Sequence, residues 1–339
     1  MEEWILNAPP GDGVSCLAFS PSSTSANDLL VASWDATCRL YDVQANSNKF
    51  TCLLGGACLA CCFNHDGSVG YAGGLDQGVY SLDMYRGGAK SLLGAHSGPV
   101  SCMATNTEHR VLFTGGWDGV VNAWDERAGI NRGNGGDGGN GGAQALDAQG
   151  GKVYSISTQA HTLVAATSAK RLLLWDVRQM AQPVVVRESP LRTQLRAVAL
   201  SPGADFLALG STEARIAVEH LGSNEQGVKK SYAFKCHRRD NVAYPVNCLA
   251  FHPVATGTFF SGGCDGVVNS WDGAKKKRVA QLPTYPTSVS ALSFSHDGGL
   301  LAIAASYTFE EGHESAAARR ESENVYVRRL AEAEVQLQS

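Results

Sequence analysis

The most constraining feature of this sequence is a strand–turn–strand unit that recurs along the chain. Its clearest copy is Val111–Asp125, which reads VLFTGGWDGVVNAWD and closes on Trp124-Asp125. The runs of apolar and β-branched residues are typical of strands, and Asp118-Gly119 between them favours a two-residue hairpin turn. A unit that repeats at a fixed period indicates an array of similar modules rather than a single continuous core.

The repeats follow one another through nearly the whole chain, about 40 residues apart, which is the period of a four-stranded propeller blade. The closing residues of the first six copies are Asp42, Asp83, Asp125, Asp176, Glu219-His220 and Asp272. A seventh copy over 287–330 lacks a closing Trp-Asp, and we expect the N-terminal Trp4–Asn7 to supply its outer strand. We therefore predict an all-β fold over 1–339: a single seven-bladed WD-repeat β-propeller, with its ring closed by the N-terminal strand.

Two segments interrupt the pattern. Gly129–Gly151 reads GINRGNGGDGGNGGAQALDAQGG, which is too polar and too rich in glycine to bury a core. We predict a disordered surface loop over 129–151. It lacks the GK[ST] ending and the strand-to-helix context of a phosphate-binding loop. A charged stretch at 310–323 is predicted to form a loop within blade seven.

Composition argues against several classes of partner and site. A net charge of −4 over 339 residues gives no global attraction for nucleic acid, so we expect no nucleic-acid partner. With no secretory leader and no bilayer-length apolar run, we expect an intracellular protein that does not enter membranes. Its ten cysteines should then be reduced, with Cys58–Cys62 forming buried core, because that cluster lacks a second pair of metal ligands. We predict no metal, no cofactor and no small-molecule ligand.

The polar residues shared by the repeats are expected to be structural. His96, Asp118 and Asp265 occupy recurring positions, where buried side chains can hydrogen-bond within a blade and satisfy groups that are costly to leave unpaired. We find no convergent nucleophile, base and oxyanion donor, and no paired carboxylates. We therefore predict no catalytic residues and a protein that is not an enzyme.

Departures from the generic repeat point to a binding surface instead. Trp34 and Trp117 precede the turn aspartates, where a small residue would suffice, and exposed tryptophan is enriched at binding hot spots. Arg196 occupies an inner strand, Arg215 follows a turn, and Lys235 precedes Cys236-His237. Cations in such places need an anionic counterpart. That counterpart is either an internal carboxylate, such as Glu213 or Glu219, or a partner.

A further basic segment, Lys275–Arg278 (KKKR), follows the sixth blade. It is consistent with a nuclear-import signal and equally with a solvated turn.

Several segments carry a resemblance to one family. They are GDGVSCLAFSP, ASWDATCRLYDV, RLLLWDVRQM, VVRESPLRTQLRAV, EARIAVEHL, KKSYAFKCHR, YPVNCLAFHP and LAIAASY. Together they resemble the mitotic checkpoint WD-repeat proteins of the budding-uninhibited-by-benzimidazole class (third member). The likeness covers nearly the whole chain, apart from the glycine-rich insert and the tail. The messenger-RNA export factor of the same WD-repeat family shares the FKCHR segment and is a close relative.

The resemblance implies a non-catalytic adaptor of the spindle assembly checkpoint, located in the nucleus, at mitotic kinetochores and in the cytoplasm. By that likeness Trp34, Trp117 and Arg196 match positions that clamp a short acidic segment of checkpoint kinases, the GLEBS motif. Arg215 and Lys235 match positions that hold a phosphothreonine in MELT-type repeats of a kinetochore scaffold. The mitotic checkpoint complex is a further candidate partner. Cations beside exposed tryptophans also suit acidic or phosphorylated peptides on physical grounds.

Two alternatives stay open. The first is the role of an export factor, which would bind a nucleoporin GLEBS segment and RNA. RNA binding requires a broad basic surface, and the net charge of −4 disfavours one. The second alternative is a substrate receptor of a cullin-type ubiquitin ligase, because Trp124–Arg127 and Trp175–Arg178 both match the WDxR signature of such adaptors.

Overall fold

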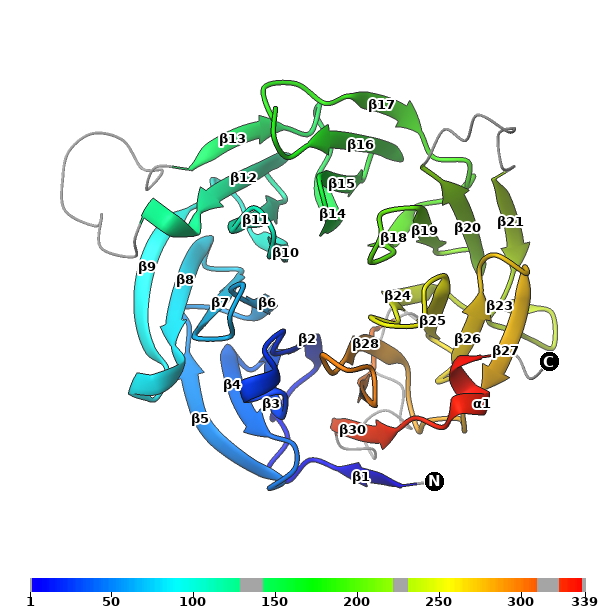
Figure 1. The fold of residues 1–339 in the computed structure, drawn as a ribbon, viewed down its shortest axis with the longest axis horizontal. Helices are drawn as coiled ribbons and strands as arrows, with labels where there is room; N and C mark the ends of the chain where they lie inside the picture. Colours follow the sequence, from blue (N-terminus) through cyan, green and yellow to red (C-terminus); the bar gives the residue numbers. More distant parts are fainter. Residues whose placement is uncertain (1, 129–142, 222–230, 310–322, 337–339) are drawn as a thin grey trace.

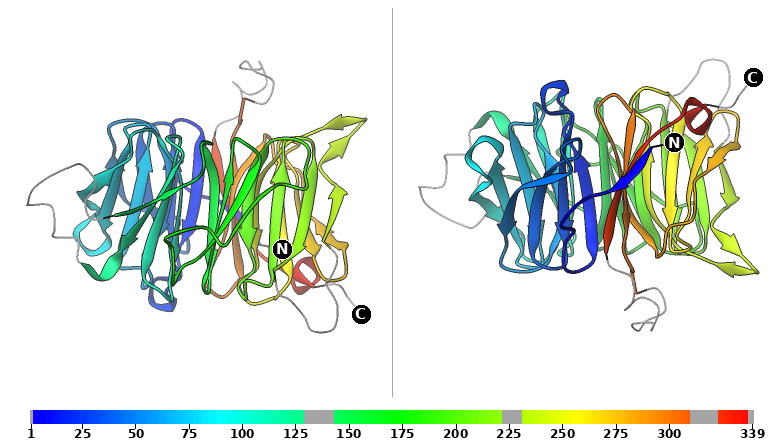
Figure 2. Two further views of the ribbon diagram at one scale, coloured as in Figure 1. Left: turned by 90° about the horizontal axis from the view of Figure 1, so that it is seen from above. Right: turned by 90° about the horizontal axis from the view of Figure 1, so that it is seen from below.

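A computed structural model describes residues 2–128, 143–221, 231–309 and 323–336. The described chain forms seven four-stranded antiparallel sheets arranged radially around a central channel, which confirms the predicted seven-bladed propeller (Figure 1). The strands run between the two faces of a flat ring (Figure 2). No helix in these ranges combines the length and the apolar character needed to cross a bilayer.

Each blade is a meander whose first strand lines the channel and whose fourth lies at the rim. Blades one and two are β2 (Val14–Phe19), β3 (Asp28–Ser33), β4 (Thr37–Asp42), β5 (Ser47–Leu53) and β6 (Cys58–Phe63), β7 (Val69–Gly74), β8 (Gly78–Asp83), β9 (Ala89–Ala95). Blades three and four are β10 (Val100–Asn106), β11 (Val111–Gly116), β12 (Val120–Asp125), β13 (Gln144–Asp147) and β14 (Val153–Gln159), β15 (Thr162–Thr167), β16 (Arg171–Asp176), β17 (Val185–Glu188). Blades five and six are β18 (Leu195–Leu200), β19 (Phe206–Ser211), β20 (Arg215–His220), β21 (Tyr232–Lys235) and β24 (Val246–Phe251), β25 (Thr258–Gly263), β26 (Val268–Asp272), β27 (Lys277–Gln281).

The seventh blade joins the two ends of the chain, as predicted. It consists of β28 (Val289–Phe294), β29 (Leu300–Ala305), β30 (Asn324–Arg329) and the N-terminal β1 (Glu3–Ile5), which pairs antiparallel with β30. Arg328, only 4% exposed, donates to Glu3 (Nη1–Oε2 3.0 Å) and to Glu334 (Nη2–Oε1 2.7 Å). Glu334 lies in a short C-terminal helix, α1 (Glu332–Val335), which the sequence did not predict. A buried arginine therefore ties the N-terminal strand, the last strand and the C-terminal helix together.

The core lies between blades rather than at one centre. Between blades three and four, for example, Phe113 and Val121 pack with Val153, Leu163 and Trp175 in one buried cluster. Each inner strand also packs against the inner strand of the next blade, and β28 against β2 completes the circle. A single blade would leave both of its faces in water, so the array is stable only as a closed ring.

Hydrogen-bonded tetrads fix two of the blades. In blade three, His96 Nδ1 lies 3.0 Å from Asp118 Oδ2, and its Nε2 lies 2.8 Å from Thr114 Oγ1, to which Trp124 Nε1 also donates. His237, Asp265, Ser261 and Trp271 repeat the arrangement in blade six. The geometry supports the predicted structural role of His96, Asp118 and Asp265, because the bonds satisfy buried groups within the blade.

One predicted loop boundary is wrong. Part of the glycine-rich segment, 129–142, lies outside the described residues, but Gln144–Asp147 forms β13, the outer strand of blade three. The edge of β12 requires a partner for its backbone groups, and Leu146 is 3% exposed within the core. Strand pairing therefore overrides a polar, glycine-rich composition at this point. The predicted blade-seven loop at 310–323 falls outside the described residues except for Glu323.

All ten cysteines are free, as expected. Cys58 and Cys61 are buried in the apolar cluster between blades one and two. Hydrogen bonds with neighbouring thiols are the larger cause, and burial the smaller, that raise the pKa of Cys58 and of Cys61. Both thiols therefore remain uncharged.

Candidate functional site

One face of the ring gathers the middle turn of every blade. In each blade the first residue after the second strand donates its backbone N–H to the residue just before the inner strand; examples are Trp34 to Gly13 (2.8 Å) and Trp117 to Pro99 (2.9 Å). These turns and the links into the inner strands therefore lie at the same end of all blades. We call this end the turn face; its turns in blades one to six are 34–36, 75–77, 117–119, 168–170, 212–214 and 264–267.

The middle turns of blades one to three each carry a large apolar side chain on the turn face. Trp34 is 48% exposed, and Trp117 is half-buried with Lys152 Nζ 5.0 Å from its ring centroid. Leu75, 37% exposed, occupies the corresponding turn position of the blade between them. Leu75 was not predicted as a site residue, although Gly74-Leu75-Asp76 occupies the same place in its repeat as Gly116-Trp117-Asp118 does in the next. We call Trp34, Leu75 and Trp117 the apolar sector.

Arg196 lies at a bulge that recurs in every inner strand. The register shifts at the same place in all seven, and one extra residue stands on the inner wall near the turn face. The bulged residues are Ser15, Leu59, Ser101, Tyr154, Arg196, Asn247 and Ser290. Four of them donate to a carbonyl of the next blade, as Asn247 Nδ2 does to Val289 O (3.0 Å). Arg196 is the charged member, and it has no ion pair with any described residue.

Arg215 and Lys235 are brought together directly. They are cross-strand partners in β20 and β21, so their side chains lie on the same face of the sheet. Two like charges directly opposite one another repel. Neither forms an ion pair within the described ranges, since Glu219 pairs with Arg187 instead (Nη1–Oε1 3.0 Å) and Glu213 offers Arg238 only its carbonyl oxygen (3.2 Å). The internal neutralisation by Glu213 or Glu219 that the sequence left open is not formed.

These cations belong to a larger group over blades four to six. We call it the basic arc: Lys152, Lys170, Arg192, Arg196, Arg215, Lys235, Arg238 and Arg239. All lie in turns, in links or at strand ends of the turn face, and none is ion-paired with a described carboxylate. Part of the arc stands on a short hairpin, β22 (Arg238–Arg239) and β23 (Val242–Ala243), which reaches beyond the body of the ring (Figure 2). Most of these residues were missed, because separate links carry them and only the closed ring brings them together.

The two WDxR segments lie at the opposite end of the blades. Arg127 forms a two-bond ion pair with Asp125 (2.8 and 3.0 Å), and Arg178 does the same with Asp176 (2.9 and 2.6 Å). Both arginines are more than half exposed. The segment Lys275–Arg278 spans the end of the turn after β26 and the start of β27, and Lys275 lies 3.7 Å from Asp272.

Comparisons with known proteins place the chain in a family. A model of the WD domain, G-beta repeat, matches residues 4–42 and 229–272, and a model of the Nucleolar protein 10-like N-terminal domain matches 54–229. The mitotic checkpoint protein BUB3.1 of Arabidopsis thaliana is 45% identical to the chain, over 97% of it and 93% of the relative. The chain belongs to the BUB3 family of mitotic checkpoint proteins. Mitotic checkpoint protein bub3 of Dictyostelium discoideum is 39% identical, over 91% of this chain and 89% of the relative.

A more distant relative represents the export branch of the same WD-repeat proteins. The mRNA export factor GLE2 of Chaetomium thermophilum is 30% identical, over 91% of this chain and 85% of the relative. The lower identity agrees with the predicted order of resemblance, in which the checkpoint family stands nearer than the export factor.

Proposed function

We propose that this BUB3-family chain is a non-catalytic adaptor of the mitotic checkpoint, which binds acidic and phosphorylated peptides on its turn face. The observation that carries the proposal is the basic arc, a group of cations without ion pairs among the described residues, beside the exposed apolar sector. A folded protein that leaves many cations without counter-charges on one face is suited to an anionic partner. The relatives named as mitotic checkpoint proteins supply the biological setting.

The apolar sector and Arg196 are the proposed site for a GLEBS segment of a checkpoint kinase. Trp34 and Trp117 stand over blades one and three, whereas Arg196 stands on the inner wall of blade five. A segment that crosses the mouth of the channel would place apolar side chains against the rings and a carboxylate against Arg196. Bonds between arginine and carboxylate are among the stronger hydrogen bonds in proteins.

Arg215 and Lys235 are the proposed site for a phosphothreonine of a MELT-type repeat. A phosphate carries close to two negative charges at neutral pH and can accept from both side chains. It would also remove the repulsion between two cations that face each other across β20 and β21. The proposed partners are the kinetochore scaffold and the mitotic checkpoint complex. With these partners, the protein would act in the nucleus and at mitotic kinetochores.

The export-factor function is the second candidate, favoured by the basic arc itself and by the likeness to GLE2. RNA binding through such an arc would weaken steeply with salt, because each neutralised phosphate releases counterions. Tight, salt-sensitive binding of single-stranded RNA would favour this function, and its absence would favour the peptide adaptor. The ubiquitin-ligase alternative stays a prediction and would use the opposite face, where the WDxR arginines are held by their own aspartates.

The test of the GLEBS site is titration with a synthetic GLEBS peptide. We expect Trp117→Ala and Arg196→Ala each to weaken binding by about 2 kcal/mol or more, the cost typical of hot-spot residues. Arg127→Ala, an exposed arginine at the opposite end of the blades, serves as the matched control and should leave the affinity unchanged. Equal affinities in all three variants would overturn the assignment.

A further inference from the structure

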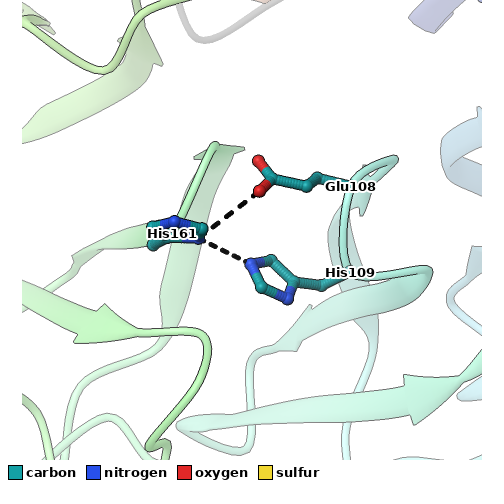
Figure 3. Close-up of side chains that lie close together, drawn as sticks. All are labelled: Glu108, His109 and His161. Carbon is teal, nitrogen blue, oxygen red and sulfur yellow. Dashed lines mark hydrogen bonds and ion pairs between the residues drawn. The ribbon is translucent and has the colours of Figure 1, made fainter.

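Opposite the turn face, two turns bring three metal-ligating side chains together. Glu108 and His109 lie in the turn between β10 and β11 of blade three, and His161 lies in the turn between β14 and β15 of blade four. His109 Nε2 is 2.7 Å from His161 Nδ1, and Glu108 Oε1 is 3.8 Å from the same nitrogen (Figure 3). All three ligand atoms lie within 4.8 Å of one another. Neither the repeat pattern nor the proposed peptide site accounts for this group.

A buried amide holds the two turns in place. Asn106, 2% exposed, donates to Thr158 Oγ1 (2.8 Å) and Ala160 O (2.9 Å) in blade four. Its Oδ1 accepts the backbone N–H of His109 (2.9 Å) in its own blade. The histidines are therefore positioned by the scaffold before any ligand arrives, which lowers the entropic cost of forming a site.

The two imidazole nitrogens are close enough to share a hydrogen bond, and a small separation of the rings would let both bind one metal ion. Without metal, the N–H of one ring donates a hydrogen bond to the bare nitrogen of the other, and the rings meet edge to face with centroids 5.0 Å apart. Zinc bonds to imidazole nitrogen are about 2.0–2.1 Å long, so tetrahedral geometry separates two such nitrogens by about 3.3 Å. An opening of about 0.6 Å between the half-exposed rings would admit the ion.

The surrounding charges leave the ligands available. Three arginines line the groove beside Glu108: Arg110, Arg127 and Arg178. Arg127 and Arg178 are each bound to their own aspartate, and Arg110 forms no ion pair with Glu108 or any other described carboxylate. Glu108 is more than half exposed, and its one described ion-pair partner is His161. The carboxylate can therefore turn toward a cation held between the rings without breaking another contact.

We propose that Glu108, His109 and His161 bind one zinc ion that bridges blades three and four. Neutral imidazole and carboxylate suit zinc, and three protein ligands leave a fourth position for water or for a group from a partner. The proposal stands apart from the peptide-binding function, since it uses the other face of the ring.

The test is competition for Zn²⁺ between the full chain and a chromophoric chelator at neutral pH. We expect the wild-type protein to bind one ion, with affinity reduced at least about tenfold by His109→Ala or by His161→Asn, since losing even an outer-shell partner of a ligand often costs that much. The asparagine variant keeps a polar atom near the position of Nδ1, which protects the contact between blades. His296→Ala removes an exposed histidine of blade seven and should leave the affinity unchanged.

Two further readouts decide whether these residues hold the ion. Zn²⁺ should raise the midpoint of thermal unfolding of the wild type and of His296→Ala, but not of His161→Asn, because only a native-state ligand stabilises the fold. Co²⁺ in place of zinc should show ligand-field bands without a thiolate charge-transfer band. No zinc binding, equal affinity in the variants, or a thiolate band would each overturn the proposal.

Discussion

At the scale of single residues, the proposed peptide site places two like charges, Arg215 and Lys235, where they destabilise the free protein. The strands pair them directly, and no described carboxylate neutralises either one. Lys277, on the outer strand of the next blade, instead faces Asp272. The like-charged pair Asp28 and Asp42 also faces across two strands, but Lys49 neutralises Asp28 there (Nζ–Oδ1 2.9 Å). Arg215 and Lys235 have no such counter-ion among the described residues, which favours an external anion.

This difference predicts opposite effects on stability. Lys235→Ala should raise the free energy of unfolding of the peptide-free protein by a few tenths of a kcal/mol, about the size of cross-strand charge effects. Lys277→Ala should lower it slightly, because its partner is acidic. Urea unfolding at low ionic strength measures both, and added salt should shrink the two effects. A destabilising Lys235→Ala would show that the two cations do not repel each other in the free protein.

At the scale of the blade, the buried histidines couple stability to pH. Burial lowers the pKa of His96, although Asp118 beside it acts in the opposite direction, and burial also lowers the pKa of His252. Below about pH 6.5, the unfolded chain then binds more protons than the folded one. These groups therefore contribute stability that is fully present above that pH and is lost as the pH falls toward their folded pKa values.

We expect the free energy of unfolding to fall between pH 7.5 and pH 5.5, and to fall less in His96→Asn/His252→Asn than in the wild type. Denaturant titrations at the two pH values measure this, and comparison with the variant removes the contribution of titrating carboxylates. A variant whose unfolding free energy changes with pH as steeply as that of the wild type would contradict this account.

The repeat was predictable at the element scale because its signals are local. Hairpin turns such as Asp118-Gly119 and the alternation around them fix strand pairs within one blade, and the closing role of the N-terminal strand followed from counting strands. β13 and α1 were missed because their structure depends on partners outside the local sequence. β13 pairs with the open edge of β12, and α1 packs on β27 of blade six, where Thr258 donates to the carbonyl of Val335 (3.0 Å). Local composition carries neither signal.

The candidate site was predictable only in part for the same reason. Trp34, Trp117, Arg196, Arg215 and Lys235 stood out as unusual residues within a repeat, and the structure places all five at the turn face. The basic arc draws its members from three blades, and the histidines of Figure 3 are 52 positions apart. Such groups exist only once the ring has closed.

At the scale of the whole molecule, closure depends on the buried Arg328. Arg328→Met should lower the free energy of unfolding by about 3–5 kcal/mol, because it leaves Glu3 and Glu334 without their cation. The adjacent Arg329→Met is the matched control, since Arg329 makes an exposed ion pair with Glu2 that should be worth under about 1 kcal/mol. Equal effects of the two substitutions in thermal or urea unfolding would contradict the closing role.

The central claim, a closed β-ring whose turn face binds an anionic peptide, is tested most directly by titration with a phosphorylated MELT-type peptide. We predict that Arg215→Ala and Lys235→Ala each weaken binding by about 1–3 kcal/mol, the cost of losing a charged hydrogen bond. The unphosphorylated peptide should bind far more weakly, and Arg127→Ala should bind like the wild type. Unchanged affinity for the phosphopeptide in both Arg215→Ala and Lys235→Ala would contradict the claim.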